Sequence, residues 1–468
     1  MAELPARAED RRTIMDNLPG GEPPSVTREG GLSDTEQRAV LAKVTTRLIP
    51  LLFVCYIVAY VDRINVGFAK LHLREVLGVD ASVFSSVYGL GAGLFFIGYF
   101  IFEVPSNLIL QRVGARLWIA RIMVVWGLVS MAFMFIKGVT MFYTMRFLLG
   151  VAEAGFFPGV IFYLTYWYPA RERARTVALF AVGGVVAGVV GSPISGALLG
   201  LNGVGGLAGW QWLFLIEGIP AVLMGLVVLL VLPDGPAKAR WLTDRERAWI
   251  QARVSEDTRL GDSSHRHQLK DAFLSGRVWL LCLIYFLFNI GAYGYEMWLP
   301  TIVKGFSGQG DAVVGLITAI PYFIAGVAML LYGKHSDRTG ERRGHLVVAA
   351  ISSAAGFALA ACFKNPWLAM VGLTLAFASL KSTLGPFWAL STSFLSGAAA
   401  AGGIALINSL GNLGGFFGPT LVGLAKDRTK SDTVALLLLG GALLGMALFV
   451  LALPGAKRAT SAGIASKG

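Results

Sequence analysis

The stretch Arg146-Phe-Leu-Leu-Gly-Val-Ala-Glu153 places two charged residues inside a long apolar segment, 139–168. About 20 apolar residues, each rising ~1.5 Å along a helix, cross the hydrocarbon core of a bilayer, so this segment is predicted to span a membrane. Arg146 and Glu153 lie about two helical turns apart and therefore project from one face. Ionisable groups inside a membrane face a bundle interior or a water-filled path and are typical of substrate or proton pathways. The stretch therefore predicts a transporter.

The composition is that of a chain with many membrane-spanning helices. Of its 468 residues, 55% are hydrophobic and 15% are charged, and the mean hydropathy is +0.65. These values are too apolar for a soluble protein of this length. The net charge of +12 is compatible with nucleic-acid binding, but the basic residues cluster in short loops between apolar segments, which is the positive-inside pattern. We therefore expect a lipid bilayer around the protein and no nucleic-acid partner.

Twelve apolar segments follow one another along the chain, and one polar stretch divides them six plus six. The expected spans are 47–69, 83–110, 117–136, 139–168, 176–200, 210–232, 278–302, 312–332, 345–363, 367–395, 402–424 and 433–454. The expected organisation is a disordered cytoplasmic N-terminal tail (1–46), an N-terminal six-helix bundle (47–232), a central cytoplasmic loop (233–277), a C-terminal six-helix bundle (278–454) and a cytoplasmic C-terminal tail (455–468).

The two halves repeat. Gly191-Ser-Pro-Ile-Ser-Gly196 is answered by Gly418-Pro-Thr-Leu-Val-Gly423, and Gly114-Ala-Arg116 by Gly340-Glu-Arg342, at closely similar offsets. Parallel halves with a substrate site between them are a recurring transporter plan. We therefore predict an all-α membrane protein with twelve transmembrane helices in two pseudo-symmetric bundles, acting as a monomer. Lys and Arg in alternate short loops predict that both termini are cytoplasmic.

One loop carries a family signature. The stretch Gly333-Lys-His-Ser-Asp-Arg-Thr-Gly-Glu-Arg-Arg343 resembles the motif of the major facilitator superfamily, in which it latches the two halves on the cytoplasmic side. The latch residues are Gly333, Asp337, Arg338, Gly340, Arg342 and Arg343. The first-half copy has Gln111 in place of the acid and Asn107 in place of the first glycine, so its latch is expected to be weaker or differently built.

Longer strings resemble the anion:cation symporter branch of that family. They are Phe96-Ile-Gly-Tyr-Phe-Ile-Phe-Glu-Val-Pro-Ser-Asn107, the Arg146 stretch continued to Gly159, and Gly209-Trp-Gln-Trp-Leu-Phe-Leu-Ile-Glu-Gly218. The match is densest to tartrate-type carboxylate permeases. The resemblance implies proton-coupled symport of a small organic anion, a hydroxy-dicarboxylate such as tartrate. It also implies a multi-pass protein of the plasma membrane, the inner membrane of a bacterium, that uses the proton gradient and no cofactor.

Independently of the family, charged residues concentrate in four predicted spans. Asp62 and Arg63 lie in the first, Arg146 and Glu153 in the fourth, Glu296 in the seventh and Lys381 in the tenth. Opposite charges hold one another ionised in a low-dielectric site, and an acid that loses its partner can take up a proton. Arginine offers a planar fork suited to a carboxylate. Binding of an anion to an arginine is therefore expected to release an acid for protonation.

The resemblance assigns roles to several of these residues. Asp62 and Glu153 match titrating positions, and Arg63 and Arg146 match basic positions near the substrate. Tyr99 matches an aromatic hydroxyl that contacts substrate, and Asn412, with Asn408 one turn away, matches a polar contact. A permanent latch between helices is the alternative for Asp62 and Arg63, and helix packing is the alternative for Tyr99 and the two asparagines.

Three further residues have open roles. Lys381 is either a third cationic contact for a dianionic substrate or the structural partner of Glu153, the acid expected at the same depth. Glu296 is expected to be an exposed charge at the outer rim. Trp388 either stacks on an aromatic substrate or belongs to the core.

Rival functions remain open at this point. They are uptake of aromatic acids of the phthalate or hydroxyphenylacetate type, uptake of sugar acids, proton-driven export, and a receptor or channel. The five histidines lie in loops or at helix ends, away from any nucleophile, so the chain is not expected to be an enzyme. No metal site is expected, because the three cysteines form no ligand motif.

Overall fold

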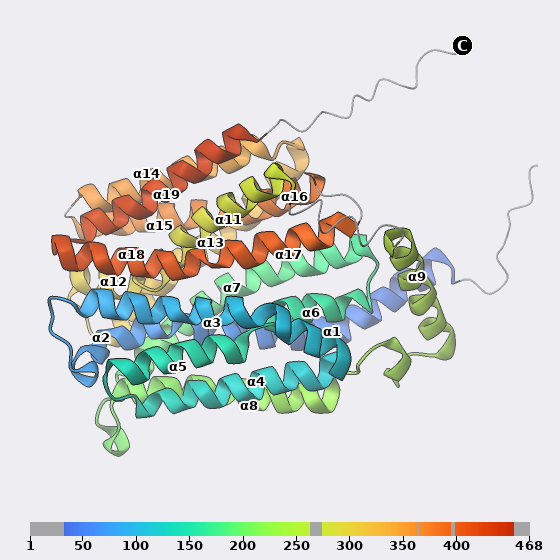
Figure 1. The fold of residues 1–468 in the computed structure, drawn as a ribbon, viewed down its shortest axis with the longest axis horizontal. Coiled ribbons are helices and arrows are strands. Elements are labelled where there is room, and N and C mark those ends of the chain that lie inside the picture. Colours follow the sequence, from blue (N-terminus) through green and yellow to red (C-terminus); the bar gives the residue numbers. More distant parts are fainter. Residues whose placement is uncertain (1–31, 263–273, 364, 395–397, 454–468) are drawn as a thin grey trace, which may run out of the picture.

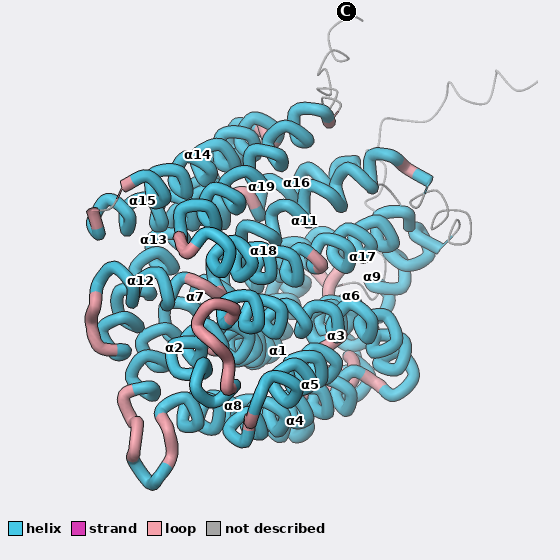
Figure 2. The backbone as a smooth tube through the Cα atoms, turned by 60° about the vertical axis from the view of Figure 1, so that its left-hand side comes forward, coloured by secondary structure: helices cyan, strands magenta, loops and turns pink. Residues whose placement is uncertain are grey.

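The structure is a computed structural model, and it describes residues 32–262, 274–363, 365–394 and 398–453. Every regular element in these ranges is a helix, and the connections between helices are short (Figure 2). The long helices lie side by side along one direction (Figure 1). The predicted all-α architecture is confirmed for these residues.

The helices before the central polar stretch, which we call the N-terminal half, are α1 (Asp34–Ile64), α2 (Val66–Leu77), α3 (Phe84–Val113), α4 (Ala115–Ala132), α5 (Gly138–Glu153), α6 (Phe156–Thr165), α7 (Ala170–Leu199) and α8 (Gly209–Val231). Short 3-10 turns lie at Phe133–Phe135, Val204–Gly206 and Pro236–Lys238.

Helix α9 (Asp244–Asp262) lies in the central polar stretch. The helices after it, which we call the C-terminal half, are α11 (Gly276–Glu296), α12 (Leu299–Ser307), α13 (Asp311–Thr339), α14 (Arg343–Cys362), α15 (Pro366–Ser382), α16 (Leu384–Phe394), α17 (Ala398–Asn412), α18 (Gly414–Thr429) and α19 (Asp432–Ala452).

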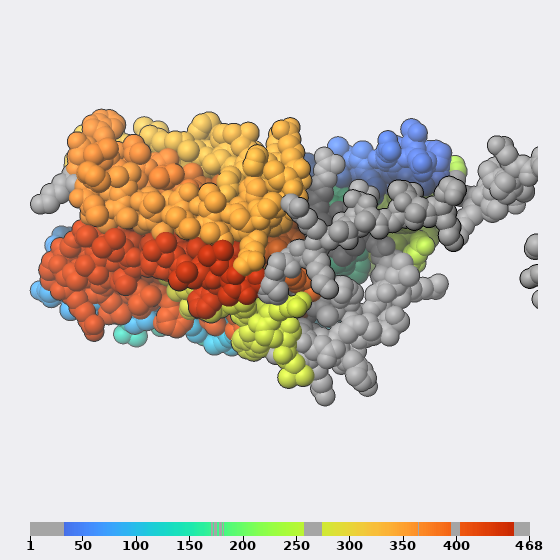
Figure 3. Space-filling model, turned by 90° about the horizontal axis from the view of Figure 1, so that it is seen from above, coloured from blue at the N-terminus to red at the C-terminus, as the bar shows by residue number. Residues whose placement is uncertain are grey.

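Eleven helical stretches of the described chain are long and apolar enough to cross a membrane. The segment expected at 402–424 is helical, as α17 and α18 of 15 and 16 residues, but is not among them. The number twelve therefore stays a prediction. Large apolar side chains such as Ile351, Val371 and Leu448 are exposed, and the face built by α14, α15 and α19 is shown in orange to red in Figure 3. Such a surface suits lipid.

The first helix begins earlier than expected. Residues 34–46 were predicted to belong to a disordered tail, but α1 starts at Asp34, where Ser33 and Glu36 form a reciprocal capping box. Such a box satisfies free backbone N–H groups of the first turn. Lys43 donates to both carboxylate oxygens of Glu246 in α9, at 3.1 and 2.8 Å, and this contact holds the pKa of Glu246 below its usual range. The start of α1 is thus tied to the central stretch.

Besides the segment divided into α17 and α18, four predicted spans are interrupted: α1 passes into α2, α5 into α6, α11 into α12, and α15 into α16. Between α5 and α6, Ala154 is extended and Gly155 has a φ of +86°, which favours glycine. Each of these four interruptions lies within two residues of a membrane charge: Arg63, Glu153, Glu296 or Lys381. Interrupted helices are tolerated where backbone groups are buried in protein or line a cavity.

The halves approach each other most closely at the end where α2 and α12 lie, which we call the α2–α12 end; α9 lies at the opposite end (Figure 1). Helix α3 packs on α18 and α7 on α13. Glycines permit this approach, because a Cβ on Gly423 would lie 2.2 Å from the backbone oxygen of Ser85 and one on Gly315 would lie 2.5 Å from that of Ser192.

Candidate functional site

An ion pair joins α1 and α5 in the middle of the molecule. A guanidinium nitrogen of Arg63 contacts Oε1 of Glu153, whose side chain is completely buried, while that of Arg63 is 13% exposed. The same arginine donates to the hydroxyl oxygen of Tyr293 in α11, at 3.2 Å. Breaking a buried pair by removing one partner costs roughly 3–5 kcal/mol, because the other charge stays buried and uncompensated. Arg63 therefore holds Glu153 ionised and also touches the opposite half.

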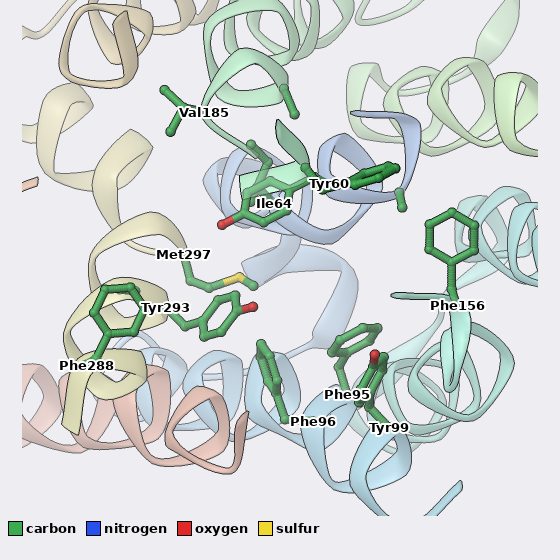
Figure 4. Packing of buried hydrophobic residues seen from close by; sticks show 14 of the residues in the cluster. Tyr60, Ile64, Phe95, Phe96, Tyr99, Phe156, Val185, Phe288, Tyr293 and Met297 are labelled. Atoms are coloured by element: carbon green, nitrogen blue, oxygen red, sulfur yellow. The ribbon is translucent and has the colours of Figure 1, made fainter. Parts of the chain in front are cut away.

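Aromatic rings surround the Arg63 guanidinium. Its Cζ atom lies 5.3 Å from the ring centre of Phe95 and 5.6 Å from that of Tyr99. Figure 4 shows both rings on α3, with Phe96 of the same helix beside Tyr293 of α11. Aromatic faces attract a cation without neutralising it, so the guanidinium keeps its charge for an anion.

A second ion pair lies in the C-terminal half. Lys381 Nζ is 2.9 Å from Oε1 of Glu296, and these residues are 6% and 2% exposed. The Tyr60 hydroxyl of α1 lies 2.9 Å from both carboxylate oxygens, and Lys381 donates to that hydroxyl oxygen at 3.2 Å. Two expectations were therefore wrong: Glu296 is buried instead of exposed at a rim, and the structural partner of Lys381 is Glu296, not Glu153. Equal depth placed Glu153 near Lys381, but the rotation of α15 turns the lysine toward α11.

The two pairs and their tyrosines form two hydrogen-bonded clusters, which meet where the Arg63 Cζ atom lies 5.9 Å from the centre of the Tyr60 ring. Together we call them the central network, and its members are Tyr60, Arg63, Glu153, Tyr293, Glu296 and Lys381. Sequence reasoning missed the two tyrosines. Their signal was present, because Tyr60 and Arg63, like Tyr293 and Glu296, are spaced three residues apart and so share a helix face.

Asp62 points away from the central network. It accepts hydrogen bonds from Ser130 of α4 and, at 3.2 Å, from Asn65, and it is 1% exposed. Its other oxygen, Oδ2, is buried without a hydrogen-bond partner in the described structure. Asp62 and Arg63 thus do not pair with each other, and the acid beside Arg63 is Glu153.

Arg146 is held inside the N-terminal half. It is fully buried, and its Nη2 donates to the backbone oxygen of Ala92 at 3.0 Å, with a longer contact of 3.4 Å from Nε to that of Gly91. These carbonyls belong to α3. In this conformation the arginine therefore joins α5 to α3, while its Nη1 atom is buried without a partner.

The remaining binding candidates lie nearer the α9 end. Asn408 donates to Glu103 at 3.2 Å, and Ser409 donates to the same carboxylate at 2.8 Å. These bonds join α17 to α3 and so connect the two halves. Asn412 is half-buried. Trp388 is half-buried and packs edge-on against Tyr285, with ring centres 5.2 Å apart.

The latch residues make their contacts within the C-terminal half. Asp337 pairs with Arg342 at 2.7 Å, and Gly340 ends α13 with a φ of +66°. Arg343 donates to the backbone oxygen of Val450, at 3.1 Å, and to that of Leu451. Arg338 is exposed and Gly333 has open space around it. In the described structure these six residues do not reach across to the N-terminal half.

The first-half copy of the latch is built from a different acid. Asp234, which follows α8, accepts from the backbone N–H of Arg116 at 3.2 Å and lies 4.0 Å from its guanidinium. Asp234 thus supplies an acid to Arg116, although position 111 carries a glutamine. The role of the first-half copy as a latch stays a prediction.

Contacts between the halves gather at the α2–α12 end. His72 lies 2.8 Å from Asp311, Asp427 accepts from the backbone of Ser86 at 2.6 Å, and Tyr88 donates to the backbone oxygen of Met297 at 3.0 Å. The halves are therefore closed against each other at that end in this conformation.

Interrupted helices that carry paired charges between two sets of helices are typical of membrane carriers. The model of the Major Facilitator Superfamily matches residues 52–419, and the chain belongs to that family. It is a multi-pass membrane transporter; members of the family are transporters and not enzymes.

Individual proteins resemble the chain over most of its length. It is 48% identical over 428 residues to a protein of Agrobacterium vitis named "Putative tartrate transporter", covering 91% of this chain and 94% of the relative. It is 43% identical over 400 residues to the "Quinolone resistance transporter" of Acinetobacter baumannii, covering 86% and 91%. The xylose transporter XylE from E. coli shares the fold, with a TM-score of 0.71, 16% identity, and coverage of 87% and 97%.

Proposed function

We propose that the protein is a proton-coupled symporter that imports a small organic anion by alternating access, with a hydroxy-dicarboxylate such as tartrate as its substrate. The observation that carries this proposal is the buried Arg63–Glu153 pair, because it joins the best carboxylate ligand among the side chains to an acid. The name of the Agrobacterium relative supports the substrate class.

The coupling step follows from the geometry of that pair. A substrate carboxylate that binds the Arg63 guanidinium competes with Glu153 for the same donor. Glu153, buried and deprived of its cation, then takes up a proton, because an unpaired carboxylate is costly in a low-dielectric site. Release of the anion restores the ion pair and expels the proton. Substrate and proton therefore travel together.

Other residues complete the proposed site. Tyr99 lies beside the Arg63 guanidinium and offers a hydroxyl group, and Lys381 offers a second cation. Asn408 and Asn412, together with Trp388, line the path toward the α9 end. Asp62 and Arg146 act in this proposal from behind the site, Asp62 by passing a proton to or from Glu153 and Arg146 as a basic group. Their present contacts lie within the N-terminal half, and the contacts of Arg146 are with α3.

The positions of the two termini decide which side of the membrane each end of the molecule faces. If both termini are cytoplasmic, as the distribution of Lys and Arg favours, α9 lies on the cytoplasmic side and the α2–α12 end faces outward. The halves are then closed toward the outside, and the six latch residues act on the cytoplasmic side. We place the protein in the plasma membrane of a bacterium, as a monomer with the proton gradient as its energy source.

The test is uptake into liposomes that contain the purified protein. The panel comprises tartrate, a sugar acid, phthalate, hydroxyphenylacetate and a quinolone, each with and without an inward proton gradient. The proposal expects gradient-driven accumulation of tartrate or a related hydroxy-dicarboxylate above the other anions. Accumulation of none of the anions, with gradient-driven quinolone extrusion, would instead establish the exporter suggested by the Acinetobacter relative.

A counterflow measurement separates a carrier from a channel or receptor. A carrier exchanges labelled external substrate for unlabelled internal substrate and so accumulates label transiently. A channel or a receptor gives no such accumulation.

A further inference from the structure

The Glu296–Lys381 pair repeats the Arg63–Glu153 pair with the charges exchanged. Arg63 in α1 and Glu153 in α5 correspond in chain order to Glu296 in α11 and Lys381 in α15, the helices at equivalent places in the second half. Tyr60 precedes Arg63 by the same three residues by which Tyr293 precedes Glu296. Each half thus holds one acid, one base and one tyrosine.

The tyrosines cross between the halves. Tyr60 of the N-terminal half bonds to Glu296, whereas Arg63 of the N-terminal half bonds to Tyr293. Figure 4 shows Tyr60 and Tyr293 on their two helices, facing the same region. A charged group of each half is therefore hydrogen-bonded to a tyrosine of the other half.

Both acids lie at the carboxyl ends of helices. Glu153 is the last residue of α5 and Glu296 the last residue of α11. A helix carries partial negative charge at this end, which disfavours a carboxylate. In each half, the cation Arg63 or Lys381 therefore supplies the charge that compensates the acid at its helix end.

Among the described residues, the cation in direct contact with Glu296 is Lys381. The groups that face it are Tyr60 from α1, Lys381 from α15 and Tyr322 from α13, with Tyr293 and Tyr295 on its own helix. All but Lys381 are phenols, which are neutral near pH 7. An anion that draws Lys381 away would therefore leave Glu296 without a counter-charge.

Both cations lie beside the same aromatic ring. The Arg63 Cζ atom is 5.9 Å, and the Lys381 Nζ atom 5.6 Å, from the centre of the Tyr60 ring. One dicarboxylate bound next to this ring would therefore have a cation available for each of its two ends.

We propose that Glu296 and Lys381 form a second coupling unit, in which Lys381 binds the second carboxylate of a dicarboxylate substrate and Glu296 takes up one further proton. This inference rests on the proposed function. The Lys381–Glu296 contact breaks, a Lys381–carboxylate contact forms, and a proton from water binds an oxygen of Glu296. Charge is conserved, because the two carboxylates of the substrate arrive with two protons, one for Glu153 and one for Glu296.

With this second unit, the net charge of the site is the same in the empty and the loaded carrier. In the empty carrier the two ion pairs are neutral. In the loaded carrier the two cations balance the dianion and both acids are protonated, so the site is neutral again. A low-dielectric interior favours this equality, since any uncompensated charge is costly.

The test measures the number of protons carried per substrate in liposomes, with a pH-sensitive dye inside and labelled dicarboxylate outside. The variant Glu296→Gln is expected to carry one proton fewer per dicarboxylate than the wild type. Its uptake then moves one extra negative charge inward and is slowed by an inside-negative potential more than wild-type uptake is. An unchanged proton number in an active Glu296→Gln protein overturns the proposal.

A double variant tests the proposal even if the single variant does not fold. The double variant Glu296→Gln/Lys381→Gln removes both charges, so it is free of the unpaired lysine that could prevent folding. It is expected to favour a monocarboxylate over the dicarboxylate and to carry one proton fewer than the wild type. Wild-type preference and proton number in the double variant contradict the second unit.

The control is Glu217→Gln, which also removes a buried acid. Glu217 accepts from Ser195 at 2.7 Å within the N-terminal half and lies outside the central network. Its proton number is expected to equal that of the wild type. Failure of the proposed function is recognised separately, because the wild type itself would then move no protons with any anion.

Discussion

The hydroxyl group of Tyr60 in α1 lies 2.9 Å from both carboxylate oxygens of Glu296 in α11. This contact joins the two halves at the depth of the buried charges. Because Lys381 donates to the same hydroxyl oxygen, any change in the second ion pair reaches α1 directly. An anion that displaces Lys381 or Glu296 would therefore change a contact between the two halves.

The variant Glu153→Gln is expected to weaken proton-driven accumulation, because only the proton bound by Glu296 remains, and to spare exchange. Exchange requires no net release of a proton, whereas accumulation depends on the acid taking one up and giving it back. Gradient-driven uptake and counterflow, measured on the same liposomes, check this expectation. Concentrative uptake at the wild-type level would exclude Glu153 as the coupling acid.

The variant Arg63→Lys keeps the charge but loses the two-pronged geometry. Substrate affinity is expected to fall by about 1–3 kcal/mol, the scale of hydrogen bonds between charged groups. Arg146→Lys is the matched comparison, because Arg146 bonds to backbone carbonyls of α3, and its main effect is expected on folding stability. Binding calorimetry and thermal unfolding separate the two effects. A larger affinity loss for Arg146→Lys would make that residue the principal substrate contact.

The variant Lys381→Ala is expected to weaken binding of a dicarboxylate and to leave its monocarboxylate analogue nearly unchanged. The loss for the dicarboxylate should be about 1.5–3 kcal/mol, as for a hydrogen bond to a charged group. Competition with labelled substrate measures both affinities. Equal losses for both anions, restored by Glu296→Gln, would show that the pair is structural only.

The variant Gly423→Val is expected to hinder closure of the α2–α12 end, because a Cβ there would lie 2.2 Å from the backbone oxygen of Ser85. Overpacking costs roughly 1–3 kcal/mol, so uptake should fall by about tenfold. Gly441→Val is the control, since a Cβ at Gly441 meets no atom within 4 Å. Equal uptake by the two variants would show that this close approach is not used in transport.

The sequence predicted the class of fold because hydrophobic length alone specifies a membrane-spanning helix. It also located the charges correctly in the first, fourth, seventh and tenth spans. Pairing was harder, because depth follows from counting residues but the direction of a side chain depends on how each helix is rotated. Lys381 was therefore placed near Glu153, although it pairs with Glu296.

The start of α1 was also misjudged. Residues 34–46 carry many polar side chains, which resemble a disordered tail, but a capping box and the contact of Lys43 with Glu246 stabilise a helix there. Both features depend on neighbours, one local and one more than two hundred residues away. Amino-acid composition alone indicates neither the capping box nor the contact between Lys43 and Glu246.

The measurement that tests the central claim most directly follows internal pH when a hydroxy-dicarboxylate such as tartrate is added to liposomes containing the protein. Imported protons should acidify the interior in step with labelled anion. Arg63→Gln and Glu153→Gln should each lower the number of protons imported per labelled anion, whereas Glu217→Gln should leave that number unchanged. Uptake of the anion by the wild type with no accompanying acidification, at any imposed potential, would contradict proton-coupled symport through the Arg63–Glu153 pair.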